Sequence, residues 1–244
     1  MGNAMVVYKA LGLLMTYPTQ ELTSASGELR AIFEGAEAMA DDVRQGLGEL
    51  VSMLESEPLL DLQERYVNLF DRTQALSLHL FEHVHGTSRE RGQAMVDLQT
   101  MYSQHGLEPS TSELPDYLPM LCEFLSLLPE DGARMMLGDL AVILGLLRYR
   151  LEARKTPYAA VPAALLDLAR ATVDEAELTA ALGDEQPVPA GMDELDRQWA
   201  EAEVTFGVGA AHSDDDAGLR NGCGGNGADE LIQLRRPHGV VGKA

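Results

Sequence analysis

Residues 130–155 read EDGARMMLGDLAVILGLLRYRLEARK, and this stretch indicates the fold class. Its leucines recur every three or four residues, the spacing that places side chains on one face of an α-helix. They are Leu137, Leu140, Leu144, Leu147 and Leu151. Further apolar residues widen this stripe until it nearly encircles the helix, and such a helix is normally buried. We therefore expect one long central helix over 130–155, ended by Pro157.

The same helical spacing recurs along most of the chain. Apolar residues three or four apart predict helices around 7–15, 29–36, 47–54, 59–70, 95–102, 114–128, 165–168 and 178–182. The strict alternation of apolar and polar residues that marks β-strands is nearly absent. The sequence thus predicts an all-α fold, a single-domain multi-helix bundle that covers residues 5–206.

The composition changes after Phe206. Residues 207–244 are rich in Gly and Asp and show no periodic apolar face, which predicts a disordered C-terminal tail. A short apolar group near the end, Leu231, Ile232 and Leu234, is expected to dock only transiently. We interpret the adjacent Arg235-Arg236 pair as two solvated charges, because twin-arginine export signals lie at the N-terminus.

Charge and cysteine content restrict the partners and the compartment. The formal net charge of −21 repels phosphate backbones, which argues against nucleic acid and favours a cationic partner such as a basic peptide. No apolar run is long enough to cross a bilayer. The two cysteines, Cys122 and Cys223, lie far apart and form no disulfide framework, as is usual in a reducing cytosol. We expect a cytoplasmic protein without stable membrane insertion.

One polar stretch could carry metal chemistry. His79-Leu80-Phe81-Glu82-His83 matches the H-x-x-E-H pattern of zinc proteases, and on a helix its two imidazoles and carboxylate would share one face. A zinc-dependent hydrolase is therefore one alternative, with Asp116 or Glu123 as conceivable third ligands. The other interpretation is a helix end whose histidines bond carbonyl groups and nearby acids. We favour the second, and expect no metal, no cofactor and no catalytic residue.

Several residues have the spacing of helix caps. Asp116 is expected to be the N-cap of a helix with Pro119 in its first turn, and to accept a hydrogen bond from the Leu118 N–H. Thr87 and Glu90 have the spacing of a capping box. The helix that they begin would end at Gly106, in a left-handed conformation.

Five stretches between residues 66 and 119 also carry a family resemblance. They are YVNLFDR (66–72), LHLFEHVHG (78–86), SRERGQAMVDL (88–98), QHGL (104–107) and ELPDYLP (113–119). They resemble the nitrate reductase branch of the TorD/DmsD/NarJ family of redox-enzyme maturation proteins, and the match is dense over residues 66–128. The Phe-Glu-His-Val-His-Gly run is specific to that branch. The resemblance implies an all-helical fold of the TorD-like type.

The resemblance also implies a function. It implies a non-enzymatic cytoplasmic chaperone that binds the N-terminal leader of the respiratory nitrate reductase catalytic (alpha) subunit. The chaperone would hold that subunit competent for molybdenum cofactor insertion before membrane attachment. A related chaperone for another molybdoenzyme is the alternative. The family commonly has Pro-Asp-His in its proposed recognition loop where this chain has Pro115-Asp116-Tyr117, so a role for that imidazole does not carry over.

Recognition of such a leader would follow helix-in-groove physics, with apolar anchors for affinity and an acidic rim for orientation. We expect the groove along the polar band 82–97 and the 115–124 region. The candidate peptide-binding residues are Tyr66, Phe70, Glu82, His83, His85, Arg89, Arg91, Gln93, Asp97, Pro115, Asp116, Tyr117, Leu121 and Phe124.

Overall fold

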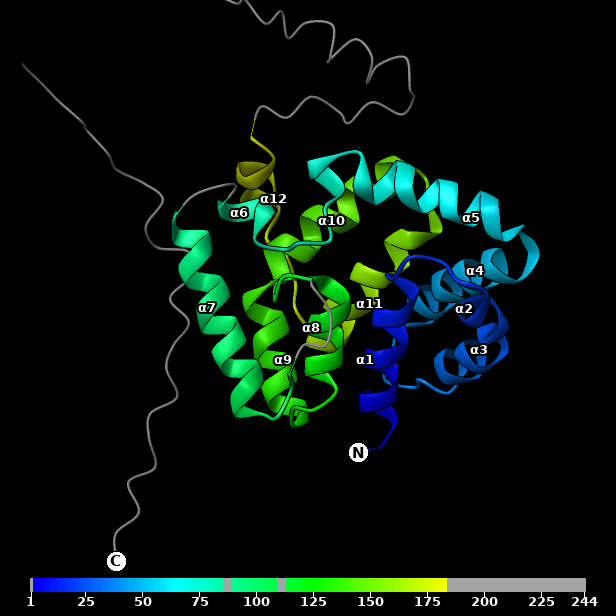
Figure 1. Ribbon diagram of the computed structural model, residues 1–244, viewed down its shortest axis with the longest axis horizontal. Helices are drawn as coiled ribbons and strands as arrows, with labels where there is room; N and C mark the ends of the chain where they lie inside the picture. The colour runs from blue at the N-terminus through cyan, green and yellow to red at the C-terminus, as the bar shows by residue number, and fades with distance from the viewer. Residues whose placement is uncertain (1, 86–88, 109–112, 184–244) are drawn as a thin grey trace, which may run out of the picture. The chain divides into compact units, whose positions relative to one another are not determined.

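Helices account for all the regular elements over residues 2–85, 89–108 and 113–183, which are the residues that the computed structural model describes (Figure 1). The elements are α1 (Gly2–Leu14), α2 (Gln20–Ser24), α3 (Ser26–Glu34), α4 (Asp41–Ser56), α5 (Leu59–Tyr66), the π-helix η1 (Val67–Asp71), the 3-10 helix η2 (Gln74–Leu76), α6 (Glu82–His85), α7 (Arg89–Gln104), α8 (Leu118–Leu125), α9 (Glu130–Asp139), α10 (Ala141–Ala153), the 3-10 helix η3 (Pro157–Ala159), α11 (Ala160–Ala169) and α12 (Glu175–Leu182). The all-α prediction is confirmed for this part of the chain.

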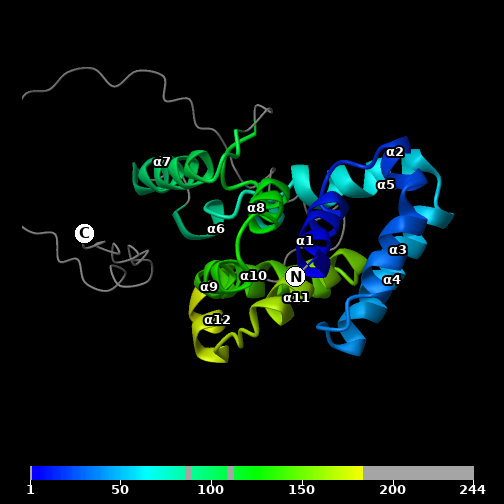
Figure 2. The ribbon, with the colours of Figure 1, turned by 90° about the horizontal axis from the view of Figure 1, so that it is seen from below.

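The core forms where helices from both halves of this region meet. Helix α11 packs against α4, α9 and α10, while α1 packs against α8 and α3 (Figure 2). The contact between α1 and α8 is close at Gly12, where an added Cβ would lie 2.9 Å from the Cβ of Cys122. A side chain at position 12 would therefore push the two helices apart.

The expected long helix over 130–155 is wrong. The structure forms two helices, α9 and α10, which meet at Leu140, whose φ of −96° and ψ of 3° interrupt the helical path. Leu137 and Leu144, on either side of the break, are nonetheless fully buried. Apolar periodicity indicates which face of a segment is buried. It does not indicate whether the helix axis bends, because a break at one residue can change the axis direction while both halves keep their apolar faces toward the core.

The expected helix over 59–70 is α5 followed by the π-helix η1, and the one expected over 114–128 is shortened to α8. Prolines and a glycine follow several helix ends. The N-terminal helix α1 ends before Pro18, α4 ends before Pro58, and Gly106 has a left-handed φ of 77° after the end of α7. The proposed capping residue Thr87 lies outside the described residues, and α7 is described from Arg89 onward.

The domain boundaries extend beyond the described region. The prediction of one domain over 5–206 and of a disordered tail over 207–244 includes residues 184–244, which lie outside the described part of the chain, and it stays a prediction. Among the described helices, none combines the length and the apolar character that a bilayer crossing requires.

Candidate functional site

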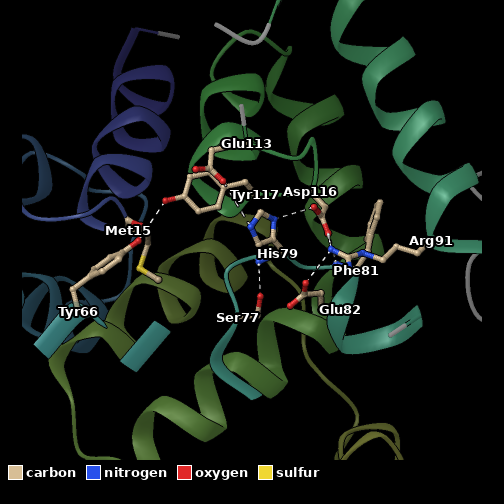
Figure 3. Close-up of polar contacts among 10 residues, drawn as sticks. All are labelled: Met15, Tyr66, Ser77, His79, Phe81, Glu82, Arg91, Glu113, Asp116 and Tyr117. Atoms are coloured by element: carbon tan, nitrogen blue, oxygen red, sulfur yellow. Dashed lines mark hydrogen bonds and ion pairs between the residues drawn. The ribbon is translucent and has the colours of Figure 1, made fainter. Parts of the chain in front are cut away.

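Two of the family-like stretches meet in a short antiparallel contact. The N–H of Leu80 donates to the carbonyl oxygen of Asp116 at 3.0 Å, and the N–H of Leu118 donates to the carbonyl oxygen of Leu78 at 2.8 Å. His79 and Tyr117 are thereby paired across an isolated β-bridge, and their rings lie 5.4 Å apart (Figure 3). The contact joins the loop before α6 to the loop before α8.

The Asp116 side chain holds this contact together from inside. It is fully buried, and its Oδ2 accepts a hydrogen bond from the N–H of Phe81 at 3.1 Å. Its Oδ1 lies 3.2 Å from His79 Nδ1, and its Oδ2 lies 3.6 Å from Arg91 Nη2 (Figure 3). A buried carboxylate requires such partners, because an unpaired charge would be costly to remove from water.

The expected N-cap role of Asp116 is therefore wrong. The N-cap of α8 is Tyr117, whose side chain makes no capping bond, and the Leu118 N–H is taken by Leu78. Pro119 does lie at the second position of the helix, in the first turn as expected. The position of an Asp just before a helix predicts a local cap. It cannot show that a backbone N–H from a distant loop will bond the carboxylate in the protein interior.

Arg91 connects α7 to this cluster. Its Nη2 lies 3.1 Å from Glu82 Oε1 as well as near Asp116, and its side chain is only 16% exposed. The charges of Glu82 and Asp116 are thus balanced within the protein by Arg91 and His79. The two acids that we assigned to a cationic peptide already have cationic partners of their own.

His79 is half-buried and faces carboxylates. Its hydrogen bond with Asp116 raises the pKa of its imidazole above the ordinary value, and the charges of Asp116, Glu82 and Glu113 act in the same direction against an opposing effect of burial. Glu113 is the outermost of the three, with its Oε2 3.8 Å from His79 Nε2 and its side chain 46% exposed. His79 thus favours its protonated, positively charged form.

His83 is engaged at both ring nitrogens. Its Nε2 lies 2.8 Å from the carbonyl oxygen of Ser77, and its Nδ1 lies 2.9 Å from Nη1 of Arg150. Because a guanidinium can only donate, Nδ1 must accept, and Nε2 must carry the proton that goes to Ser77. Arg150 is buried in the last turn of α10 and also donates to the carbonyl oxygen of Ala75 at 3.0 Å. This pair ties the 75–83 segment to the central helix.

The geometry of the H-x-x-E-H stretch differs from the one considered above. Helix α6 begins at Glu82, so His79 lies outside it, in the bridge with Tyr117, and the expectation of one shared helical face is wrong. Over the described ranges, no group of three or more His, Cys, Asp or Glu side chains is placed to hold a metal ion.

Aromatic rings form the next layer beside the bridge. The hydroxyl of Tyr66 donates to the carbonyl oxygen of Met15 at 3.0 Å and lies 3.4 Å from the Tyr117 hydroxyl. The Tyr66 ring contacts Phe70 at 4.9 Å and Tyr17, edge-on, at 5.6 Å. Tyr66 and Phe70 are themselves buried. They hold Tyr117 and Tyr17 in place from within the core.

Leu121 and Phe124 lie deeper still. Both are fully buried, and the Phe124 ring packs against Tyr102 at a centroid distance of 4.7 Å. Tyr102 in turn donates its hydroxyl to the carbonyl oxygen of Pro115 at 2.8 Å. In this structure these residues support the 115–117 loop from beneath and are not part of its surface.

The remaining candidate residues lie along α6 and α7. Gln93 and Asp97 are exposed on α7 and bond each other, with Nε2 2.9 Å from Oδ1. His85 ends α6 and Arg89 begins α7, and the side chains of both lie outside the described part. The candidates therefore fall into a buried group under the bridge and an exposed group on α7, with Tyr117 half-exposed between them.

Sequence reasoning missed four residues around Tyr117. Burial raises the pKa of the Tyr117 hydroxyl, and the negative charges of Glu113 and Asp71 act in the same direction against the opposing effect of its hydrogen bond with Tyr66. Tyr17 and Leu114 are each 46% exposed. We call Tyr17, Asp71, Glu113, Leu114 and Tyr117 the Tyr117 face. Asp71, Glu113 and Leu114 lie within the family-like stretches. Their position in those stretches is the sequence feature that could have identified them as candidates.

The chain matches a known protein family and several named proteins. The model of the family described as "Nitrate reductase delta subunit" matches residues 36–163, a range that includes the bridge and most of the Tyr117 face. The nitrate reductase molybdenum cofactor assembly chaperone NarJ of Escherichia coli K12 is 40% identical over 195 residues, covering 79% of this chain and 81% of the relative. The probable assembly chaperone NarW of the same strain is 40% identical over 202 residues, covering 83% and 84%.

A more distant relative extends the range of organisms. The probable nitrate reductase molybdenum cofactor assembly chaperone NarJ of Bacillus subtilis is 29% identical over 154 residues, covering 63% of this chain and 83% of the relative. The extent of the matches to the family model and to both Escherichia coli proteins confirms the resemblance inferred from the sequence. The chain belongs to the nitrate reductase delta subunit family, as a member of the NarJ type.

Proposed function

We propose that this protein is a dedicated, non-enzymatic assembly chaperone of respiratory nitrate reductase that acts in the cytoplasm. It binds the N-terminal leader of the catalytic (alpha) subunit and keeps that subunit competent for molybdenum cofactor insertion before membrane attachment. The observation that carries this proposal is the 40% identity, over about four fifths of both chains, to a protein named as a nitrate reductase molybdenum cofactor assembly chaperone. The chaperone itself holds no metal or cofactor in this proposal.

The charge balance of the site favours the Tyr117 face as the place where the leader binds. Glu82 and Asp116 are paired with Arg91 and His79, so they offer little attraction to an incoming cation. Asp71 and Glu113 are exposed, and Glu113, which faces His79 at 3.8 Å, is still 46% open to solvent and to an incoming cation. A leader with basic residues beside an apolar helix would place its cations on these two carboxylates.

Apolar contacts would supply most of the affinity. Tyr17, Leu114 and Tyr117 present rings and an aliphatic side chain beside the carboxylates, a combination suited to an amphipathic helix. Tyr117 also preserves a ring at the position where the family commonly has histidine. The exposed residues of α7, Gln93 and Asp97, would extend the contact, and the buried candidates would fix the shape of the surface that the leader meets.

A calorimetric titration with the synthetic leader peptide of the nitrate reductase catalytic subunit tests both parts of the proposal. We expect saturable binding to the parent, and about tenfold weaker binding to a Tyr17→Ala, Glu113→Gln variant if these side chains are interface hot spots. The matched control is Leu60→Ala, Glu177→Gln, which removes an exposed apolar side chain and an exposed charge on α5 and α12.

The outcomes separate the function from the location. A parent that binds no leader, or that binds leaders of other molybdoenzymes equally well, contradicts the proposed function. A parent that binds specifically while both double variants bind equally well contradicts only the assignment of the Tyr117 face. Melting curves of each variant exclude loss of folding as the cause.

A further inference from the structure

The solvent-facing side of α1 and of the turn after it is apolar. Between residues 5 and 17 the exposed side chains are, in chain order, Met5, Val6, Lys9, Leu13 and Tyr17, and only Lys9 carries a charge. Helix α4 shows the usual pattern, because its exposed positions hold polar or charged residues. We call Met5, Val6, Leu13 and Tyr17 the α1 stripe, and each of the four is between 44% and 50% exposed. Such a row on the outside of a helix is typical of a surface that a partner covers.

The one charge beside the α1 stripe is neutralised within the protein. Lys9 Nζ lies 2.8 Å from Glu123 Oε1 of α8, and both side chains are about half-exposed. A lysine held by its ammonium group still offers the methylene groups of its stem to apolar neighbours. The middle of the surface therefore contributes a net charge close to zero, and apolar contact dominates there.

Tyr17 belongs to both the α1 stripe and the Tyr117 face. Its ring contacts the Tyr66 ring at 5.6 Å, and the Tyr66 hydroxyl lies 3.4 Å from the Tyr117 hydroxyl. Both ribbon views show α1 beside α8, the helix that begins just after Tyr117 (Figure 1 and Figure 2). The α1 stripe and the Tyr117 face thus form one continuous surface.

The two ends of this surface differ in charge. One end is the Tyr117 face, where Asp71 is exposed and Glu113, although it faces His79 at 3.8 Å, is 46% exposed. Toward the start of α1, the carboxylate of Glu130 is paired with Arg134 at 2.7 Å. A cationic group on a ligand is therefore attracted to the Tyr117 end.

The size of the α1 stripe favours a short helix over a second copy of the chain. From Val6 to Tyr17, a helical rise of about 1.5 Å per residue gives roughly 16 Å, or about three turns. A strip of that length and about 10 Å wide, the diameter of one helix, covers roughly 160 Å². Each partner in a stable protein–protein interface buries about 800 Å², and two copies that each carry a charge of −21 repel each other. A single amphipathic helix of about three turns is the occupant that fits.

We propose that the leader of the nitrate reductase catalytic subunit binds as a helix along the α1 stripe, with the N-terminus of the leader at the Tyr117 face. This inference rests on the proposed function and adds the position and the direction of the ligand. The α-amine and the positive end of the helix dipole both lie at a helix N-terminus, where carboxylates such as Asp71 and Glu113 attract them. Apolar side chains of the leader then cover Val6 and Leu13, and the rest of the catalytic subunit continues beyond Met5.

The position is tested by calorimetric titration of the synthetic leader peptide into Val6→Gln, Leu13→Gln. Glutamine retains helix propensity and replaces two apolar contacts by polar groups, so binding should weaken about tenfold. The matched control is Leu60→Gln, Met135→Gln, which changes two exposed apolar side chains on α5 and α9. Its affinity should stay within about twofold of the parent. Melting curves establish that each variant is folded.

The outcomes of this titration separate the inference from the proposed function. A parent that binds the leader while Val6→Gln, Leu13→Gln binds it equally well overturns the position on α1 and leaves the proposed function intact. A loss of affinity that is as large in Leu60→Gln, Met135→Gln also overturns the position. A parent that binds no leader overturns both the inference and the proposed function.

The direction is tested by photo-crosslinking in the full chain, with p-benzoylphenylalanine in place of either Tyr17 or Met5. With the leader bound, the probe at position 17 should cross-link to the first turn of the leader. The probe at position 5 should cross-link to residues about three turns later, as located by mass spectrometry. The same probe in place of Met135 is the control and should give no cross-links to the leader. The reverse order would overturn the direction, and cross-links between two copies of the chain that persist with saturating leader would overturn the leader as the occupant.

Discussion

The buried carboxylate of Asp116 accepts a hydrogen bond from the backbone N–H of Phe81 at 3.1 Å, although the two residues are 35 positions apart. The same carboxylate faces His79 and Arg91, so a single side chain joins the loop before α6, the start of α7 and the loop before α8. Three of the five family-like stretches, 78–86, 88–98 and 113–119, meet at this one acid. Its removal would leave a buried N–H and buried cations without their partner.

Asp116→Ala should therefore be strongly destabilising. Breaking a buried ion pair by removing one partner costs about 3–5 kcal/mol in the free energy of unfolding, and Asp116→Asn should cost less because it keeps an acceptor for the Phe81 N–H. Denaturant titration measures both. Asp97→Ala, an exposed acid on α7, is the control and should stay within about 0.5 kcal/mol of the parent. Equal stability of Asp116→Ala and Asp97→Ala would show that the buried cluster contributes nothing.

Arg150 should be required for the position of the 75–83 segment. Arg150→Met removes the donors to Ala75 and His83, and lost hydrogen bonds from a charged group should cost about 2–3 kcal/mol in unfolding free energy. Arg148→Met, which removes an exposed ion pair with Glu152, should cost less than about 1 kcal/mol. Equal unfolding free energies for Arg150→Met and the parent would refute this assignment.

The same contact predicts the tautomer of His83. In the parent at neutral pH, long-range ¹⁵N correlation spectra should show a proton on Nε2 and an unprotonated Nδ1, because the Arg150 guanidinium can only donate to Nδ1. In Arg150→Met that restriction is lifted, and the tautomer ratio should shift. Detection of an Nδ1–H in the parent would be incompatible with the contact.

The pairing of His79 predicts a pH dependence of stability. The pKa of His79 is raised in the folded protein, chiefly by the Asp116 hydrogen bond, so the folded state holds the proton more tightly than the unfolded state. The stabilising contribution is then fully present below the unfolded value of 6.5 and is lost as the pH rises through the folded pKa. The stability advantage of the parent over His79→Gln should therefore shrink as the pH rises above the unfolded value of 6.5.

Denaturant titrations of both proteins across that pH range measure this difference. His105→Gln is a suitable comparison, because His105 is exposed just after the end of α7 and bonds the backbone carbonyl of Met101 in that helix. An advantage over His79→Gln that grows with rising pH would contradict the direction of the shift.

Leu144→Ala should be among the more costly substitutions in the core. Leu144 is fully buried on α10, and truncation of a buried leucine to alanine typically costs about 2–5 kcal/mol. Met135→Ala, at a side chain that is 71% exposed on α9, should change stability by less than about 0.5 kcal/mol. Thermal or denaturant unfolding of the two variants side by side checks the prediction, and similar losses in both would mean that α10 is not central.

The histidines of the H-x-x-E-H stretch should bind no stoichiometric metal. Both ring nitrogens of His83 are engaged by Ser77 and Arg150, and His79 Nδ1 faces Asp116. Elemental analysis after dialysis against a chelator should find far less than one zinc per chain, with no difference between the parent and His83→Ala. Retention of one zinc per chain that disappears in His83→Ala would revive the hydrolase alternative.

The amino-acid sequence by itself determined the fold class and most helix positions. Apolar spacings of three and four residues are a local property, and burial of that face is what stabilises each helix, so periodicity suffices to place helices such as α4 and α11. The family-like stretches were equally accessible, because residue identity alone carries a resemblance. Their match to relatives at 40% identity confirms the family.

Tertiary structure alone decided what the polar residues do. Asp116 has the spacing of an N-cap, yet it bonds Phe81, because burial makes a paired carboxylate more favourable there than a solvated cap. Glu82 and Arg91 pair across two helices, while the Glu113 carboxylate faces His79 at 3.8 Å and stays 46% exposed. The break at Leu140 likewise follows from packing on different neighbours. Sequence periodicity describes one segment at a time, whereas these outcomes depend on partners that only folding brings within a few ångströms.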